Sequence, residues 1–280
     1  MPLEDDFCDI IKKARMGLGM SVQSVAQSAG MTETELTRLE RGGQTKDRAI
    51  VRTLASVLGL RPPALERIAL NQWQPAVQEP EPSLDTIHGS VGGYGVQGYL
   101  LHNGEEALAI DTGYNAPSMI AALRRNQLRL LGICLTHGHS DHADGVEALL
   151  AYREVPVYLG EEDRDLLAWR PPLRLLAVPV DGLTIPVGRL RLRCLTTPGH
   201  TPGGICYLVE GGSQSCCFVG DTLFAGSIGR SNPSSLYRSH LVSVHRRLLT
   251  LPSDCRLLPG HGPATTVAEE REHNPFAITI

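Results

Sequence analysis

Thr-His-Gly-His-Ser-Asp-His stands at positions 136–142, directly after the apolar run Leu-Leu-Gly-Ile-Cys-Leu. This heptapeptide places three imidazoles, His137, His139 and His142, and the carboxylate of Asp141 within six residues. Neutral imidazole and carboxylate are ligands of zinc, iron and manganese. In a loop that leaves a strand, residues i and i+2 can face one ion while residues i+4 and i+5 face another. Core packing does not explain such a cluster, so we predict a metal site at the end of a buried strand.

Four other candidate ligands also follow short apolar runs. Asp111 follows Leu-Ala-Ile, His200 follows Leu-Arg-Cys-Leu-Thr-Thr-Pro-Gly, Asp221 follows Cys-Phe-Val-Gly and His261 follows Arg-Leu-Leu-Pro-Gly. Loops at one edge of a sheet are where α/β proteins gather functional groups that are distant in sequence. The glycines before Asp221 and His261 let the backbone turn sharply there. We therefore expect all these side chains to meet at one edge of a sheet.

The composition excludes several classes of protein. No run of about 18 apolar residues is present, and the acidic N-terminus differs from a signal peptide, so we expect a cytoplasmic protein without a membrane partner. The net charge of −4 excludes a strongly basic protein. The seven cysteines include no Cys-x-x-Cys pair, which favours buried, reduced thiols.

The 280 residues divide into two expected domains joined by a linker. Residues 1–70 show apolar positions three or four apart, which indicates helices. Residues 71–83 are rich in Pro and Glu, which is typical of an extended linker rather than a packed element. Residues 84–280 alternate short apolar runs with turns and helical stretches, which indicates an α/β fold. The runs expected as strands are 99–101, 107–110, 130–135, 190–195, 217–219 and 256–258.

The ligand order in residues 84–280 resembles the metallo-beta-lactamase superfamily. Three flanking phrases, at 197–204, 220–230 and 259–266, resemble the small bacterial glyoxalase II-like hydrolases of that superfamily. The resemblance implies an αββα sandwich. It also implies two metal sites with a shared carboxylate: His137, His139 and His200 at the first, Asp141, His142 and His261 at the second, and Asp221 bridging them.

A pair of divalent cations is the cofactor that this resemblance implies. We expect zinc, with iron and manganese as alternatives. Two cations a few ångströms apart can lower the pKa of a bridging water toward 7 and polarise a carbonyl. Asp141 and Asp221 are accordingly the expected catalytic carboxylates, Asp111 and Thr222 the expected supports of the ligands, and Arg230 the expected contact for a substrate carboxylate.

The glyoxalase II-like resemblance implies a thioester or a related ester as substrate. The chain continues for only 19 residues after His261, and Ser-Asn-Pro-Ser-Ser follows Arg230, so glutathione specificity is not expected. Three alternatives stay open: a mononuclear-iron persulfide dioxygenase, a lactonase or phosphodiesterase of the same fold, and a ligand-sensing transcriptional regulator with an idle metal domain.

Residues 19–42, together with the Leu-Ala-Ser-Val-Leu-Gly-Leu at 54–60, resemble the helix-turn-helix domain of the Cro and phage-repressor family. This resemblance implies DNA as a partner and a homodimer. The expected DNA contacts are Arg15, Thr32, Thr34, Arg38, Lys46 and Arg48. Residues 1–72 hold 10 Lys and Arg against 9 Asp and Glu, and Val22 replaces the Gln common in that family. A role in dimerisation or protein docking is therefore the alternative.

Overall fold

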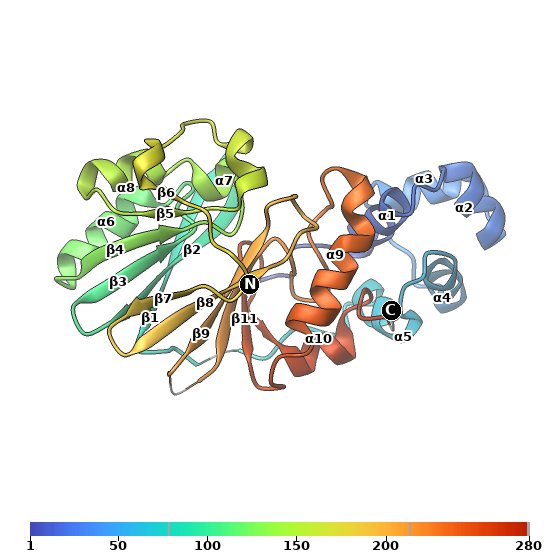
Figure 1. The fold of residues 1–280 in the computed structure, drawn as a ribbon. Coiled ribbons are helices and arrows are strands. Elements are labelled where there is room, and N and C mark those ends of the chain that lie inside the picture. The colour runs from blue at the N-terminus through green and yellow to red at the C-terminus, as the bar shows by residue number, and fades with distance from the viewer. Residues whose placement is uncertain (78, 213, 279–280) are drawn as a thin grey trace.

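The computed structural model describes residues 1–77, 79–212 and 214–278. Five short helices form the N-terminal unit (Figure 1). They are α1 (Phe7–Gly17), α2 (Val22–Ala29), α3 (Glu33–Glu40), α4 (Arg48–Val57) and α5 (Pro62–Ala69). Ser21 caps α2 and Thr32 caps α3 with their hydroxyls, and Gly30 ends α2 in the left-handed conformation. The helix-turn-helix expected from the sequence is therefore present.

Two six-stranded sheets form the rest of the chain (Figure 1). The first sheet has the order β1-β2-β3-β4-β5-β6 and the second the order β12-β11-β10-β9-β8-β7. The strands of the first sheet are β1 (Leu84–Val91), β2 (Tyr94–Asn103), β3 (Glu106–Ile110), β4 (Arg129–Cys134), β5 (Val157–Tyr158) and β6 (Leu176–Ala177). Those of the second are β7 (Thr184–Val187), β8 (Leu190–Thr196), β9 (Ile205–Glu210), β10 (Cys216–Gly220), β11 (Arg256–Pro259) and β12 (Thr265–Thr266).

Helices cover the outer face of each sheet. On the first sheet lie α6 (Ala116–Arg125), α7 (Ser140–Ala143) and α8 (Val146–Tyr152), followed along the chain by the short helical turns η1 (Glu161–Leu166) and η2 (Leu173–Leu175). On the second lie η3 (Ser234–Leu236), α9 (Tyr237–Ser243), η4 (Val244–Leu248) and α10 (Val267–His273). The αββα sandwich is confirmed. All six runs expected as strands fall on strands. The six strands that were not expected are β1, which is a half-exposed edge strand with polar residues, and β5, β6, β7, β9 and β12.

The space between the sheets is filled by apolar side chains from both of them. Tyr99 and Leu108 of the first sheet pack with Leu192, Tyr207 and Phe218 of the second. All seven cysteines are free thiols, and six of them are buried, which agrees with the sequence expectation. None of the helices in the described part of the chain is long and apolar enough to cross a lipid bilayer.

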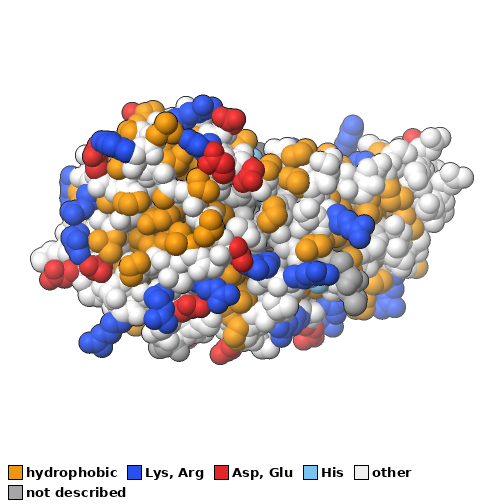
Figure 2. Space-filling model, viewed as in Figure 1, with side chains coloured by type: hydrophobic (Ala, Val, Ile, Leu, Met, Phe, Trp, Pro, Cys, Tyr) orange, Lys and Arg blue, Asp and Glu red, His pale blue; other side chains and the backbone are white. Residues whose placement is uncertain are grey.

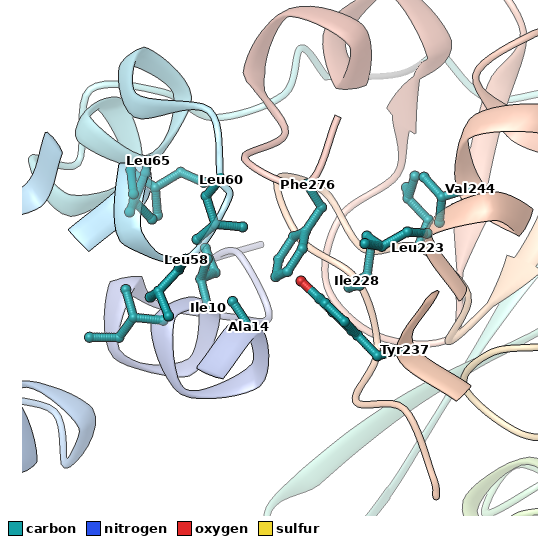
Figure 3. Close-up of a cluster of buried hydrophobic side chains, with 14 of the residues drawn as sticks. Ile10, Ala14, Leu58, Leu60, Leu65, Leu223, Ile228, Tyr237, Val244 and Phe276 are labelled. Atoms are coloured by element: carbon teal, nitrogen blue, oxygen red, sulfur yellow. The ribbon is translucent and has the colours of Figure 1, made fainter. Parts of the chain in front are cut away.

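The two units share one hydrophobic core. Ile10 and Leu58 of the N-terminal helices belong to the same buried cluster as Leu223, Tyr237 and Phe276 of the sandwich (Figure 3). In Figure 3, the Phe276 ring lies between the side chains of the N-terminal helices and those of the sandwich. The N-terminal unit is therefore packed onto the helical layer of the second sheet.

Residues 71–83 contain no helix or strand among those that the structure describes, as expected of a linker. However, Trp73 stacks on the ring of His273 with centroids 4.9 Å apart, and the backbone amide of Ala76 donates to Glu269 at 2.7 Å. The expectation of an unpacked linker is thus wrong for its first half. A single tryptophan gave the sequence pattern too little apolar character to indicate docking.

Candidate metal centre

The expected ligands converge at one edge of the sandwich. Strands β8, β10 and β11 point the same way, because β9 is antiparallel to both β8 and β10, and β10 is parallel to β11. In the first sheet, β3 and β4 are parallel. The loops that leave β4, β8, β10 and β11 bring together three groups whose ligand atoms lie within 4.8 Å of one another. The groups are His137, His139 and His200; His137, Asp141 and His142; and His142, Asp221 and His261.

The first cluster is His137, His139 and His200. His200 Nδ1 lies 2.8 Å from the carbonyl oxygen of Arg230, so it donates there and leaves Nε2 with a lone pair. That Nε2 faces His139 Nδ1 at 3.0 Å. The Nε2 atom of His137 is buried and has no hydrogen-bond partner among the described residues. Three imidazole nitrogens therefore point into one small space.

The second cluster is Asp141, His142 and His261. His142 Nδ1 donates to Asp111 at 2.9 Å, and His261 Nδ1 donates to the Gly95 carbonyl at 2.6 Å. When both rings are neutral, their Nε2 atoms carry lone pairs, and these face each other at 3.3 Å. Asp141 Oδ2 lies 3.2 Å from His261 Nε2, and the Asp141 side chain is one-third exposed. The cluster is therefore open to solvent on the side of Asp141.

Asp221 lies between the two clusters. Its Oδ1 is 3.2 Å from His142 Nε2 and 3.8 Å from His261 Nε2, while its Oδ2 is 3.7 Å from His200 Nε2. Oδ1 is buried and has no hydrogen-bond partner among the described residues. One carboxylate thus turns one oxygen toward each imidazole cluster.

This arrangement of donors fits two cations. Lone pairs of two neutral rings that face each other at 3.3 Å repel, and a buried nitrogen or carboxylate oxygen without a partner is costly. One cation within each cluster would be bound by the nitrogen and oxygen atoms that face into that cluster. Imidazole nitrogen with carboxylate oxygen is a donor set that suits zinc, iron and manganese.

The protonation states of His137, His200 and Asp221 also suit metal binding. At His142 and His261, burial has the opposing effect, but nearby carboxylates raise the pKa. Burial lowers the pKa of His200 to about 4, and burial with the neighbouring His142 and His200 holds the pKa of His137 well below its usual value. Both rings are therefore neutral at pH 7. Burial opposes charge on Asp221, but His142 and His261 hold the pKa of its carboxyl well below its usual range. Asp221 is therefore an anion.

Asp111 orients the ligand loop after β4, as the sequence predicted. Its Oδ1 accepts from the Thr136 amide, and its Oδ2 accepts from the Thr136 hydroxyl, both at 2.8 Å, in addition to the bond from His142. These bonds fix the tautomer and direction of the His142 ring, which is a common role for a carboxylate behind a metal ligand.

The two glycines before Asp221 and His261 serve different purposes. Gly220 has a φ of +47°, which favours glycine, so it permits the turn that the sequence analysis expected. Gly260 has no positive φ. A Cβ atom built there would lie 2.2 Å from the His142 ring, so glycine is needed for close packing against a ligand.

The sequence analysis missed three buried polar residues that hold the ligand loops. Asp163 accepts from the Gly138 amide, the Thr201 hydroxyl and the Gly203 amide, and so joins the loop of His137 and His139 to that of His200. No motif surrounds Asp163 in the sequence; only the structure shows that it is fully buried.

The other two missed residues are Gln97 and His240. The Gln97 side chain donates to the Gly262 carbonyl at 2.6 Å, next to His261. His240 is buried between the Ser231 hydroxyl at 3.1 Å and the Thr222 carbonyl at 2.8 Å, and it supports the segment that follows Asp221. His240 has no motif around it in the sequence, so nothing there signalled this role.

Neither Thr222, the expected ligand support, nor Arg230, the expected substrate contact, hydrogen-bonds to a proposed ligand through its side chain among the described residues. The Thr222 hydroxyl lies 3.5 Å from the Thr197 hydroxyl and contacts no ligand side chain, so the expectation that it orients a ligand is not supported. Arg230 is exposed, and its guanidinium has no partner among the described residues. Only its backbone carbonyl touches a ligand, through His200 Nδ1.

The expected DNA contacts differ in how far other groups engage them. Thr34, Arg38 and Lys46 are exposed on or after α3, and Arg38 Nη1 donates to the Gln44 carbonyl at 3.4 Å. Arg15 instead pairs with Glu40 through two hydrogen bonds of 2.5 and 2.7 Å and is only 14% exposed, so the structure argues against a phosphate contact. Arg48 pairs with Glu66, and the Thr32 hydroxyl accepts from the Glu35 amide as a helix cap. A one-dimensional pattern could not reveal these partners, which are distant in sequence for both arginines.

The fold and the clustered imidazoles define a metal-binding αββα protein, and the comparisons with known proteins name its class. The family model of the metallo-beta-lactamase superfamily matches residues 91–265, and a helix-turn-helix model matches residues 11–65. The chain belongs to the metallo-beta-lactamase superfamily. It is a metallo-hydrolase of this superfamily with a helix-turn-helix domain in front.

Two relatives show where in the superfamily the chain lies. It is 32% identical over 200 residues to the probable metallo-hydrolase YqgX of Bacillus subtilis, which covers 66% of this chain and 94% of the relative. It is 30% identical over 187 residues to the hydroxyacylglutathione hydrolase GloC of Haemophilus influenzae, covering 61% of this chain and 87% of the relative. Both matches leave about a third of this chain unmatched.

Solved structures agree with this placement. The B3 metallo-beta-lactamase BLEG-1 superposes with a TM-score of 0.60 at 29% identity, covering 69% of this chain and 99% of that one. TTHA1623, solved in a di-iron-bound form, gives a TM-score of 0.58 at 34% identity, covering 66% of this chain and 97% of that one. The fold and the ligand clusters imply divalent metal ions in this chain as well.

Proposed function

We propose that this chain is a binuclear metal-dependent hydrolase of a thioester or a related ester. The observation that carries the proposal is the Asp221 carboxylate, which turns one oxygen to each of two imidazole clusters. His137, His139 and His200 would hold one divalent ion, Asp141, His142 and His261 the other, and Asp221 both. We propose zinc for the two ions, with iron or manganese as alternatives.

Two bound divalent ions would supply a water with a pKa near 7 and a polarised substrate carbonyl. The chain's own groups determine the rest. Asp111 keeps the His142 ring in one tautomer, and the backbone carbonyls of Arg230 and Gly95 do the same for His200 and His261. Asp141 is the most exposed of the proposed ligands in the second cluster, so its carboxylate is placed to accept a proton from an incoming water.

The substrate class rests on relatives and on one side chain. GloC, by its name, hydrolyses hydroxyacylglutathione, which is a thioester. In this chain, Arg230 is exposed, and its backbone lies against His200. Its planar guanidinium is suited to a substrate carboxylate. We therefore propose a thioester or ester that carries a carboxylate, held by Arg230.

Metal analysis of the purified protein, together with a hydrolysis panel, tests this function. We expect two metal ions per chain and turnover of a thioester in preference to lactones and phosphodiesters. Arg230→Ala should raise KM for an anionic thioester and leave both its metal content and its KM for a neutral thioester unchanged. Arg125→Ala, a change of another arginine on an exposed helix, serves as the control. One iron per chain with oxygen uptake would instead indicate a persulfide dioxygenase.

We further propose that the N-terminal domain binds DNA weakly and as a dimer. The exposed candidates are Thr34 and Arg38 on α3 and Lys46 after it. On the face drawn in Figure 2, the helix-turn-helix region at the right carries few Lys and Arg side chains. Few cations release few counterions, so binding should depend only shallowly on salt, and a single domain should bind poorly.

A fluorescence anisotropy titration of the full-length protein against genomic fragments, at low and at moderate salt, tests DNA binding. We expect binding above the non-specific background, with half-sites about 34–36 Å apart in the bound fragment. Arg38→Ala should weaken it, whereas Arg15→Ala should act only through stability, because Arg15 is paired with Glu40. If no fragment binds above background while the protein dimerises, the domain serves in assembly.

A further inference from the structure

The N-terminal arm of the helix-turn-helix domain reaches the metal centre. Glu4 lies against Gly262, the residue after the proposed ligand His261: a Cβ atom on Gly262 would stand 3.1 Å from both the backbone nitrogen and the Cβ atom of Glu4. Gly262 has a φ of +72°, so this turn favours glycine on two grounds. The turn that carries His261 is therefore shaped to receive residue 4.

Further contacts fix this arm in place. Asp5 is buried, forms an ion pair with Lys13 and accepts from the Ser227 hydroxyl. Lys13 also donates to the Ile228 carbonyl at 3.0 Å. Ser227 and Ile228 belong to the segment between the proposed bridging ligand Asp221 and Arg230. The arm and α1 are thus bonded to the loop that leaves the metal centre.

A stack of side chains continues this contact to the proposed ligand itself. The Lys13 ammonium lies 5.1 Å from the centroid of the Phe224 ring, and that ring meets the His261 ring edge to face at 5.9 Å. Phe224 comes from the sandwich, and Lys13 comes from the N-terminal domain. The surroundings of His261 are consequently built from both domains.

The Glu4 side chain of this arm is exposed. It makes no hydrogen bond or ion pair among the described residues. Partial burial raises the pKa of its carboxyl, while His261 lowers it, and Asp5 and Asp221 raise it. Glu4 therefore lies close enough to two proposed ligands for their charges to act on it. Its ionised carboxylate places a negative charge beside the turn that carries His261.

We propose that the N-terminal domain forms part of the substrate-binding rim of the metal centre, with Glu4 as a specificity-determining residue. The proposal rests on the proposed hydrolase function for its substrate class. Glu4 disfavours substrates that carry an anionic group on the His261 side and favours a cationic group such as an ammonium there. The backbone carbonyl of Arg230 bonds to His200 of the other cluster, so the two ends of the proposed site carry residues of opposite charge.

The test uses the full-length protein loaded with Co²⁺ and two small thiols of opposite charge, mercaptoacetate and 2-aminoethanethiol. Binding of each thiol is measured from the visible absorption of Co²⁺, which does not depend on turnover. We expect Glu4→Lys to change the ratio of the two dissociation constants on the order of tenfold in favour of mercaptoacetate. The anionic thiol then meets attraction in place of repulsion, and the cationic thiol meets repulsion in place of attraction. Glu4→Gln should give about half that shift on a logarithmic scale.

The control is Glu105→Lys, the same change of charge at an exposed position by the start of β3, at the opposite end of that strand from Asp111. It should leave the ratio unchanged. The proposal would be overturned if wild type and Glu4→Lys gave the same ratio of dissociation constants at equal metal content and melting temperature. It would also be overturned if Glu4→Lys and Glu105→Lys changed this ratio equally. If no thioester or ester is hydrolysed, the proposed function fails, but the thiol ratio still decides the role of Glu4.

Discussion

The Asp163 carboxylate accepts a 2.7 Å hydrogen bond from the Thr201 hydroxyl, which belongs to the residue that follows His200. The same carboxylate accepts from the Gly138 amide, between His137 and His139. Burial raises the pKa of Asp163, and the bonds from Thr201, Gly203 and Gly138 lower it. The fully buried Asp163 side chain therefore bonds to residues adjacent to all three proposed ligands of the first cluster. It bonds to no residue adjacent to a proposed ligand of the second cluster.

Asp163→Asn should weaken metal binding selectively at the first cluster, by about 10- to 100-fold, because an amide cannot accept all three bonds as a carboxylate does. The measurement is a chelator competition that resolves the two metal equivalents. Asp165→Asn, an exposed neighbour on the same 3₁₀ helix, should behave as wild type. Equal loss of both metals would contradict a positioning role that is specific to this cluster.

Asp111→Asn should lower metal affinity at the second cluster by about 10- to 100-fold, because Asp111 holds the His142 ring through a 2.9 Å bond. Thr222→Val is the matched comparison: its hydroxyl faces Thr197, so we expect unchanged metal affinity. The reverse ranking of the two variants would show that the structure misplaces the support of the ligands.

Asp221→Ala should abolish turnover and reduce the metal content, because this carboxylate faces both imidazole clusters. Inductively coupled plasma analysis and thioester hydrolysis measure the two effects. Asp144→Ala, a carboxylate outside the clusters, is the control. Retention of two metals at near-normal activity would rule out a bridging role.

Phe276→Ala should destabilise the whole chain by about 3–5 kcal/mol, because the ring is fully buried between the two domains (Figure 3). Since both domains share this core, we expect a single unfolding transition in which far-UV circular dichroism and the fluorescence of Trp73 and Trp169 coincide. Val180→Ala, at a side chain that is 67% exposed, should be neutral. Separate transitions for the two domains in the wild-type protein would contradict the shared core.

Glu270 should make stability depend on pH. Burial raises the pKa of its carboxyl to about 7, against the bonds from Asn274, Thr265 and Gly226. The folded state then holds a proton that the unfolded state releases, so this group's contribution falls as pH rises from about 4.5 to 7, by up to about 3 kcal/mol. Above pH 7 it is constant.

Glu270→Gln should remove this decline, which makes the variant more stable than wild type at pH 8 relative to pH 5. Urea denaturation at several pH values measures it. Glu272→Gln, on the exposed side of the same helix, should leave the slope unchanged. Identical pH profiles for wild type and Glu270→Gln would show that Glu270 does not titrate in this range.

Much of the metal centre could be predicted from the sequence, because its residues are either close together along the chain or directly follow recognisable strands. Thr-His-Gly-His-Ser-Asp-His supplies four of the seven proposed ligands, and each of the others follows an apolar run that forms β8, β10 or β11. Asp163, Gln97 and His240 could not be predicted. Their partners lie 9 to 165 residues away, and nothing local distinguishes them from other loop or helix residues.

The DNA-binding face shows the same limit. The helix-turn-helix could be recognised because helix caps and helical periodicity are local features. Whether its arginine side chains are free to contact DNA could not be recognised. Arg15 and Arg48 are engaged by Glu40 and Glu66, which are 25 and 18 residues away. A carboxylate at such a separation neutralises a cation only if the helices pack in one particular way.

The sequence by itself indicated the α/β class, six of the strands, the helix-turn-helix and the candidate ligands after those strands, since periodicity, turns and motif spacing are properties of short segments. Only the tertiary structure decided how the two units are joined. Residues 4, 13, 73 and 276 show no pattern that predicts an interface, yet Glu4 meets Gly262, Lys13 meets Phe224, Trp73 stacks on His273 and Phe276 fills the shared core. Contacts between distant segments follow from which surfaces bury the most apolar area together, and that depends on the shape of the whole molecule.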